Sequence, residues 1–110
     1  MPNFDFLEPR IAGLHHHQFV GDKANSLEFG LNLILVREPE NPHDRNAVRI
    51  DHPDGRKVGY IPANQAAWVS RLIDHGHALG CQVAFVSAPQ SLVAVTLTLP
   101  DLRPTKESAT

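Results

Sequence analysis

The chain has 110 residues, of which 42% are hydrophobic, and this length and composition fit one domain built around one core. Its formal net charge of -2 gives no overall basic field of the kind that attracts nucleic acid, although a locally basic patch stays compatible with it. One cysteine excludes an internal disulfide framework and a cysteine-rich zinc site, and no apolar run approaches the roughly 18 residues of a membrane span.

The first third of the chain predicts two strands. Residues 1–9 carry acids where a signal peptide would carry bases, so we interpret them as an N-terminal extension of a cytoplasmic protein with no membrane partner. Residues 10–19, RIAGLHHHQF, are expected to form the first strand, which carries three consecutive histidines. Residues 28–38, EFGLNLILVRE, alternate and then become apolar, a pattern typical of a long strand buried on one or both faces.

Residues 46–61 predict a β-hairpin. Apolar and polar residues alternate over 46–51, and residues 56–61 form the returning strand. The intervening HPDG indicates a turn, because proline fixes φ, Asp54 bonds to nearby backbone and Gly55 tolerates a positive φ.

The period then changes from strand to helix. Residues 62–76, PANQAAWVSRLIDHG, have apolar residues at helical spacing between an initial proline and a final glycine. Residues 81–88 and 91–100 predict a closing hairpin, and residues 101–110 a flexible tail.

Together these elements predict a mainly β fold. Six short strands with one good helix are typical of a small OB-like or SH3-like six-stranded antiparallel β-barrel with one main α-helix. We expect this domain to occupy residues 10–100.

A stiff polar corner, REPENPHDRNAV at residues 37–48, separates two of these strands. Its prolines restrict φ, and Asn41 and Asn46 are of the type that stabilises turns, so scaffolding is the simplest interpretation of those residues. Asp44 is different, because a carboxylate accepts the hydrogen bond of a ribose 3′-hydroxyl and repels a 3′-phosphate. Asp44 is therefore a candidate for chemical discrimination between strand ends.

The corner and the hairpin after it, LVREPENPHDRNAVRIDHPDGRKVGYIP at residues 35–62, resemble the HIRAN domain family. The family pattern is R-[DE]-P-x-N-P-x-D-x-N-A-[IV], then a short strand, a glycine turn and V-G-[HY]-[IL]-P. The similarity extends over residues 10–99. It implies an OB-like barrel that occurs in fork-remodelling helicase-like ATPases and in small free-standing proteins. In the best understood members the corner aspartate, here Asp44, meets the 3′-hydroxyl of single-stranded DNA.

The resemblance also implies aromatic rings that hold the end bases and a basic residue that meets phosphate. This chain has histidines where such members have tyrosines, in the corner and in the first strand, and Leu92 where they have a phenylalanine. A histidine ring stacks on bases and, when protonated, pairs with phosphate. The predicted contacts are Asp44 at the strand end, stacking by His16, His43 and Tyr60, phosphate binding by His15 and Arg45, and Leu92 in the last hairpin.

The histidines also allow a metal site. His15 and His17 lie two apart on a predicted strand, so their rings point to one side, and imidazole is a common zinc or nickel ligand. His43 would complete the site, with Asp44 beside it, if the corner folds next to the first strand. The simpler interpretation is a group of exposed histidines that needs no cofactor.

No catalytic motif is present: the sequence has no nucleophile elbow, P-loop or H-E-x-x-H. We therefore expect a non-enzymatic module that recognises the 3′-hydroxyl ends of single-stranded DNA in DNA repair or replication-fork processing. A separately encoded helicase or nuclease is the expected protein partner. The alternative is a metal-binding or protein-interaction adaptor on the same barrel, and a metal-dependent nuclease is the third candidate.

Overall fold

The computed structural model describes residues 3–15, 18–19, 26–87 and 89–100. Its elements are β1 (Asn3–Leu7), β2 (Asn32–Arg37), β3 (Val48–Asp51), β4 (Lys57–Tyr60), α1 (Ala63–Asp74), β5 (Gly80–Ser87) and β6 (Leu92–Pro100). The strands form one six-stranded sheet in the order β1-β6-β5-β2-β3-β4, and every pairing is antiparallel. The predicted fold class is confirmed, as are the predicted hairpins and helix.

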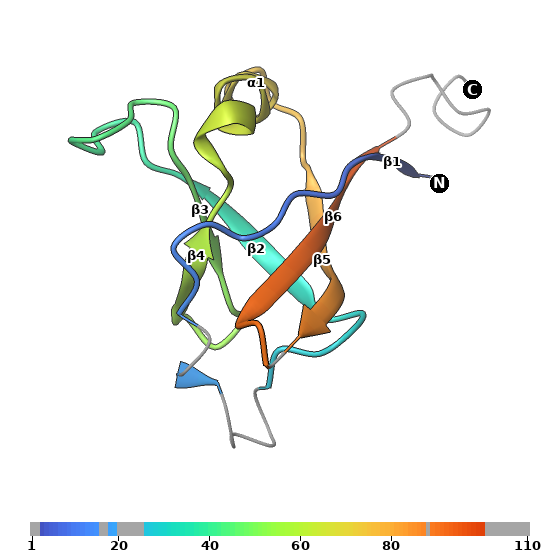
Figure 1. Cartoon of the computed structure of the whole chain (residues 1–110). Coiled ribbons are helices and arrows are strands. Elements are labelled where there is room, and N and C mark those ends of the chain that lie inside the picture. Colours follow the sequence, from blue (N-terminus) through green and yellow to red (C-terminus); the bar gives the residue numbers. More distant parts are fainter. Residues whose placement is uncertain (1–2, 16–17, 20–25, 88, 101–110) are drawn as a thin grey trace, which may run out of the picture.

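The sheet curls into a barrel because the segment of residues 9–15, here called the closing segment, bonds to strands on both sides. The Ile11 amide donates to the Val93 carbonyl of β6 at 2.8 Å, while Ala12 and Tyr60 of β4 exchange a pair of 2.8 Å bonds. Figure 1 shows this segment crossing the molecule between β6 and β4. The closing segment therefore links β6 to β4 and covers part of the free edge of each strand.

The prediction of a strand over residues 10–19 was wrong for the part that the structure describes. Arg10 and Ala12 form only isolated bridges, one to each neighbouring strand. The chain changes its bonding partner between them, and Gly13 then turns it with a φ of +57°. A continuous ladder with one partner is thus impossible here, and the first strand of the structure is the earlier β1.

Close approach of the closing segment to β4 requires glycine at position 59. A Cβ there would lie 2.6 Å from the Ala12 carbonyl oxygen and would also collide with the Ile11 side chain. No real Cβ contact is that short, so only a residue without a side chain permits this seam.

The barrel interior is aliphatic, and α1 lies across one end of it (Figure 1). Ala66 and Val69 of α1 are buried in the same cluster as residues of β2, β3, β4, β5 and β6. The largest fully buried side chains are Phe19, Val48, Ile50, Val58, Val69, Val83, Val93, Val95 and Leu97. In the described part of the chain, α1 is too short and too polar to cross a membrane.

Candidate functional site

Backbone amides bonded to side chains make the corner rigid. The Asn41 Oδ1 accepts from the amides of His43 at 2.8 Å and Asp44 at 3.1 Å. One carboxylate oxygen of Asp44 accepts from the Asn46 amide at 2.8 Å, and its carbonyl accepts from the Ala47 amide at 3.0 Å. These bonds to neighbouring amides fix the direction of the Asp44 side chain.

Glu38 connects the corner to the adjacent hairpin. Its Oε1 accepts from Asn41 Nδ2 and from the Tyr60 hydroxyl, both at 2.9 Å, and its Oε2 accepts from Arg49 Nη1 at 2.8 Å. These bonds, that from Asn41 first, lower the pKa of Glu38 below its usual value. The same carboxylate raises the pKa of Tyr60, because it binds the neutral phenol.

A cavity of about 430 Å³, here called the corner cavity, lies between the corner and β4. Its charged and aromatic walls are His43 and Asp44 on the corner and Lys57 and Tyr60 on β4. The full lining is Ala12, Asn41, His43, Asp44, Ala47, Lys57, Tyr60, Ile61 and Ala63. A few polar and charged side chains thus share the cavity with apolar ones, the usual composition of a ligand site.

Lys57 and Tyr60 face the same cavity although three residues separate them. In the pairing of β3 with β4, Ile50 lies opposite Gly59 and Asp51 lies opposite Lys57, so one step on β3 spans two on β4. This irregularity buries Val58 and Gly59 together and brings the Lys57 Nζ to 5.1 Å from the Tyr60 ring centroid. A cation over an aromatic face is an attractive contact.

Three predicted site residues meet at the corner cavity, namely His43, Asp44 and Tyr60. The other described ones do not line it. The backbone amide of half-buried His15 bonds to Val58, Arg45 is exposed, and Leu92 lies half-buried at the start of β6 opposite Ser87. His16 and His17 lie outside the described residues.

The zinc or nickel site stays a prediction. Within residues 3–15, 18–19, 26–87 and 89–100, no three His, Cys, Asp or Glu side chains gather as metal ligands would. The predicted set of His15, His17 and His43 includes a residue beyond those ranges.

Sequence reasoning missed both Lys57 and Glu38. The signal for Lys57 was its place in the strand that also carries Tyr60, but strict alternation puts residues three apart on opposite faces. The signal for Glu38 was its place at the acidic position of the R-[DE]-P motif at the start of the corner, but no role was assigned to it from the sequence.

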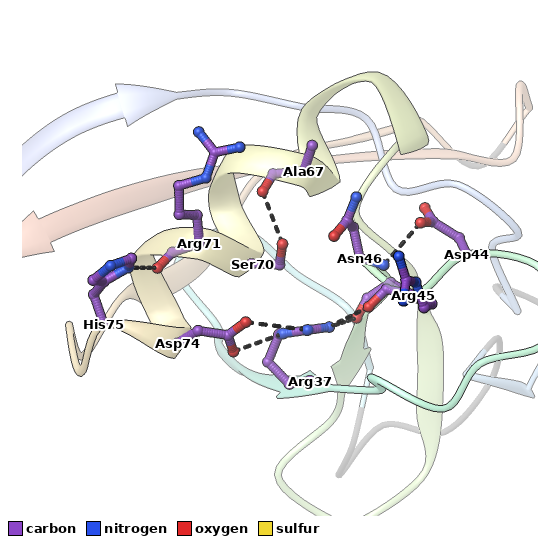
Figure 2. A network of polar contacts seen from close by, with 10 residues as sticks. Arg37, Asp44, Arg45, Asn46, Ala67, Ser70, Arg71, Asp74 and His75 are labelled. Atoms are coloured by element: carbon purple, nitrogen blue, oxygen red, sulfur yellow. Dashed lines mark hydrogen bonds and ion pairs between the residues drawn. The ribbon is translucent and has the colours of Figure 1, made fainter.

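Arg37 fastens the corner to the end of the helix, as Figure 2 shows. Its Nε and Nη2 donate to the Asp74 carboxylate at 2.9 and 3.2 Å, and its Nη1 donates to the carbonyls of Arg45 and Ala47, each at 3.0 Å. Nε, Nη1 and Nη2 of this guanidinium are therefore all hydrogen-bonded, and Arg37 also lowers the pKa of Asp74, chiefly through its hydrogen bond.

A second cavity, of about 480 Å³, shares Asn41 and Tyr60 with the corner cavity. Its lining is Glu38, Pro39, Glu40, Asn41, Pro42 and Tyr60. Its two carboxylates disfavour phosphate, so the corner cavity is the better candidate for an anionic ligand.

Comparison with known sequences finds a match to the HIRAN domain over residues 5–98. The helicase-like transcription factor of Oryctolagus cuniculus is 32% identical over 72 residues, which are 66% of this chain and 7% of that protein. The Fanconi-associated nuclease 1 homolog of Arabidopsis thaliana is 42% identical over 51 residues, 46% of this chain and 6% of that protein. The chain thus spans only a small part of the length of these relatives.

Solved structures show the same fold. The crystal structure of the HIRAN domain of human HLTF aligns with a TM-score of 0.72 at 21% identity, covering 88% of this chain and 76% of that one. A crystal structure from Lactobacillus plantarum aligns with a TM-score of 0.72 at 23% identity, covering 88% and 92%. At these identities the likeness establishes the architecture alone.

Proposed function

The chain belongs to the HIRAN domain family, and from this premise we propose that it binds DNA and recognises the 3′-hydroxyl end of a single strand. The process served is DNA repair or replication-fork processing, and the chain itself binds without catalysing a reaction. The names of its relatives include a helicase-like factor and a nuclease, which supports a protein of either class as its partner.

The observation that carries the proposal is the position of Asp44 in the wall of the corner cavity. One of its carboxylate oxygens is bonded to the Asn46 amide, and the other has no hydrogen-bond partner among the described residues. A carboxylate with a spare oxygen accepts a hydroxyl proton and repels a terminal phosphate. Because the turn fixes this side chain, the acceptor is already oriented before a ligand arrives.

Rings on two walls of the corner cavity support binding of a base. Tyr60 is held by its hydroxyl bond to Glu38, and His43 projects from the corner as an exposed side chain. Stacking of a base on an aromatic ring contributes about 1–3 kcal/mol. We propose these two as the stacking residues, with His15, His16, Arg45 and Leu92 as candidates for contacts beyond the cavity.

The test is fluorescence-anisotropy binding of a short single-stranded oligonucleotide with a 3′-hydroxyl and of its twin with a 3′-phosphate. We expect a preference for the hydroxyl on the order of tenfold, the worth of one charge-assisted hydrogen bond. Asp44→Asn is the informative variant, because the amide oxygen still accepts from the Asn46 amide while the charge is gone. It should fold normally and lose the preference.

Equal affinity of the unmodified protein for the two oligonucleotides would contradict end recognition. Each titration is run metal-free and with zinc. Binding that appears only with zinc would point instead to the histidines of residues 15–17.

A further inference from the structure

We propose that Lys57 is the phosphate-binding residue of the corner cavity. The smallest ligand of the cavity is then one nucleotide that carries both a 5′-phosphate and a free 3′-hydroxyl. This inference rests on the proposed function and deepens it, since it assigns the second charged group that the cavity would recognise.

The cations near the corner are not equivalent. Of the described residues that line the corner cavity, Lys57 is the one lysine or arginine. Arg49 is bonded to Glu38 at 2.8 Å and to both oxygens of Asp51 at 2.8 and 3.0 Å. Arg37 is bonded to Asp74 and to two carbonyls. Arg37 and Arg49 are therefore already bonded to carboxylates, and Arg45, the exposed cation of the corner, does not line the cavity.

Lys57 is held in place without being neutralised. Its Nζ lies 5.1 Å from the Tyr60 ring centroid, and no carboxylate of the described chain lies within ion-pairing distance of it. The ring attracts the ammonium but accepts no conventional hydrogen bond, so the N–H donors of Lys57 are available. An ammonium group in this state is suited to a phosphate oxygen.

Asp44 and Lys57 reach the cavity from different elements, the corner and β4. In a nucleotide at a 3′ end, the sugar separates the 3′-hydroxyl from the 5′-phosphate. Asp44 would accept from the hydroxyl while Lys57 pairs with the phosphate, and the small side chains of Ala12, Ala47 and Ala63 leave room for the sugar between them. The volume of about 430 Å³ lies in the lower range of small-ligand sites, about 300–1,000 Å³, which fits one nucleotide.

The first experiment measures how salt weakens binding of the 3′-hydroxyl oligonucleotide. Each phosphate contact on single-stranded nucleic acid contributes about 0.7 to the slope of log K against log salt concentration. Lys57→Gln should bind about tenfold more weakly at low salt, with a slope shallower by about 0.7. Lys57→Arg should restore the slope, because it restores the charge.

Arg71→Gln is the matched control. Arg71 is an exposed cation of α1 whose side chain points away from the corner in Figure 2, and its loss should leave the slope unchanged. Thermal unfolding of each variant verifies that the barrel is intact.

The second experiment tests the minimal ligand by competition. Thymidine 5′-monophosphate should displace the oligonucleotide at lower concentration than thymidine, which lacks phosphate, or thymidine 3′-monophosphate, which presents phosphate to Asp44. Against Lys57→Gln, thymidine 5′-monophosphate and thymidine should compete equally.

The outcomes separate the two proposals. If the 3′-hydroxyl preference is present but Lys57→Gln keeps the slope of the unmodified protein, the assignment of Lys57 is overturned and end recognition stands. If Arg45→Gln rather than Lys57→Gln makes the slope shallower, the phosphate lies outside the cavity and the inference is again overturned. If the unmodified protein binds no oligonucleotide, end recognition fails and the inference fails with it.

Discussion

Glu38 is the residue on which the geometry of the site depends. Its carboxylate accepts hydrogen bonds from Asn41 in the corner, from Tyr60 on β4 and from Arg49 on β3. It touches no part of the corner cavity itself. Its role is thus to hold the corner and the Tyr60 ring at a fixed spacing, so that two walls of the cavity form one surface.

The hydrogen bond between Tyr60 and Glu38 predicts an altered phenol titration. Because the bond stabilises the protonated phenol, it raises the pKa of Tyr60 above the usual value near 10. Tyr60 is the only tyrosine of the chain, so the ultraviolet absorbance of tyrosinate reports on it alone. We expect Glu38→Gln to move the midpoint toward the usual value. An unchanged midpoint would show that the hydroxyl is held by something else.

Glu38 also predicts a pH dependence of stability. Its pKa is lowered in the folded state, so its stabilising effect is present above the unfolded pKa of about 4.3 and is lost as the pH falls through the folded value. Glu38→Gln should reduce the free energy of unfolding by about 1–2 kcal/mol near neutral pH, and the gap to the unmodified protein should close below about pH 4. Chemical denaturation at several pH values measures this. Exposed Glu40, changed to Gln, is the control that should show no gap.

Some of the individual site residues could be predicted from the sequence. His43, Asp44 and Tyr60 line the corner cavity and lie in the irregular motif that matches the HIRAN pattern. They could therefore be identified from the sequence without knowledge of how the chain packs. Lys57 was not predicted, because regular alternation along β4 would put it on the opposite face of the strand from Tyr60. The shift in pairing between Ile50 and Asp51 breaks this alternation. Arg45 was predicted for phosphate from its charge alone, yet its side chain does not line the cavity.

Among the elements, the closing segment is the one that periodicity misjudged. RIAGLHHHQF contains apolar and aromatic residues in a strand-like order, but Arg10 pairs with β6 and Ala12 with β4. Sequence patterns record which residues are buried and not which partner they bond, so a change of partner inside five residues is invisible to them. The hairpins, the turn at residues 52–55 and the helix were predicted correctly, because each depends on local contacts.

The seam between the closing segment and β4 predicts a strong effect of Gly59→Ala. The added Cβ meets the Ala12 carbonyl, which is backbone and cannot rotate away. We expect a loss of about 1–3 kcal/mol in the free energy of unfolding, the usual cost of overpacking. Urea denaturation measures it.

Gly80→Ala is the matched control for this prediction. There the added Cβ meets the side-chain oxygen of Thr98, which can turn aside, so the effect should be smaller and should shrink further when Thr98 is changed to Ala. Equal losses in the free energy of unfolding for Gly59→Ala and Gly80→Ala would mean that the backbone at Ala12 moves aside for the added Cβ.

For the molecule as a whole, the reactivity of the Cys81 thiol reports on opening of the folded barrel. It lies on β5 in the middle of the sheet, opposite Leu33 of β2 and Leu97 of β6, and its thiol is buried. Burial raises its pKa to about 12, so near neutral pH almost no reactive thiolate is present in the folded protein. A thiol reagent should therefore label the native protein far more slowly than the unfolded one, and Gly59→Ala should accelerate the native reaction. Rapid native labelling would place Cys81 in a region that opens locally.

The closing segment also has a consequence for how the protein is made. Residue 9 bonds to residue 95 and residue 11 to residue 93, so contacts that complete the barrel join nearly opposite ends of the chain. Such a high contact order slows folding and postpones it until the last strand has left the ribosome. Because Ala12 forms part of the cavity wall, a nascent chain has no complete corner cavity at any earlier stage. Ligand binding at this site would therefore be restricted to chains in which β6 has already been synthesised.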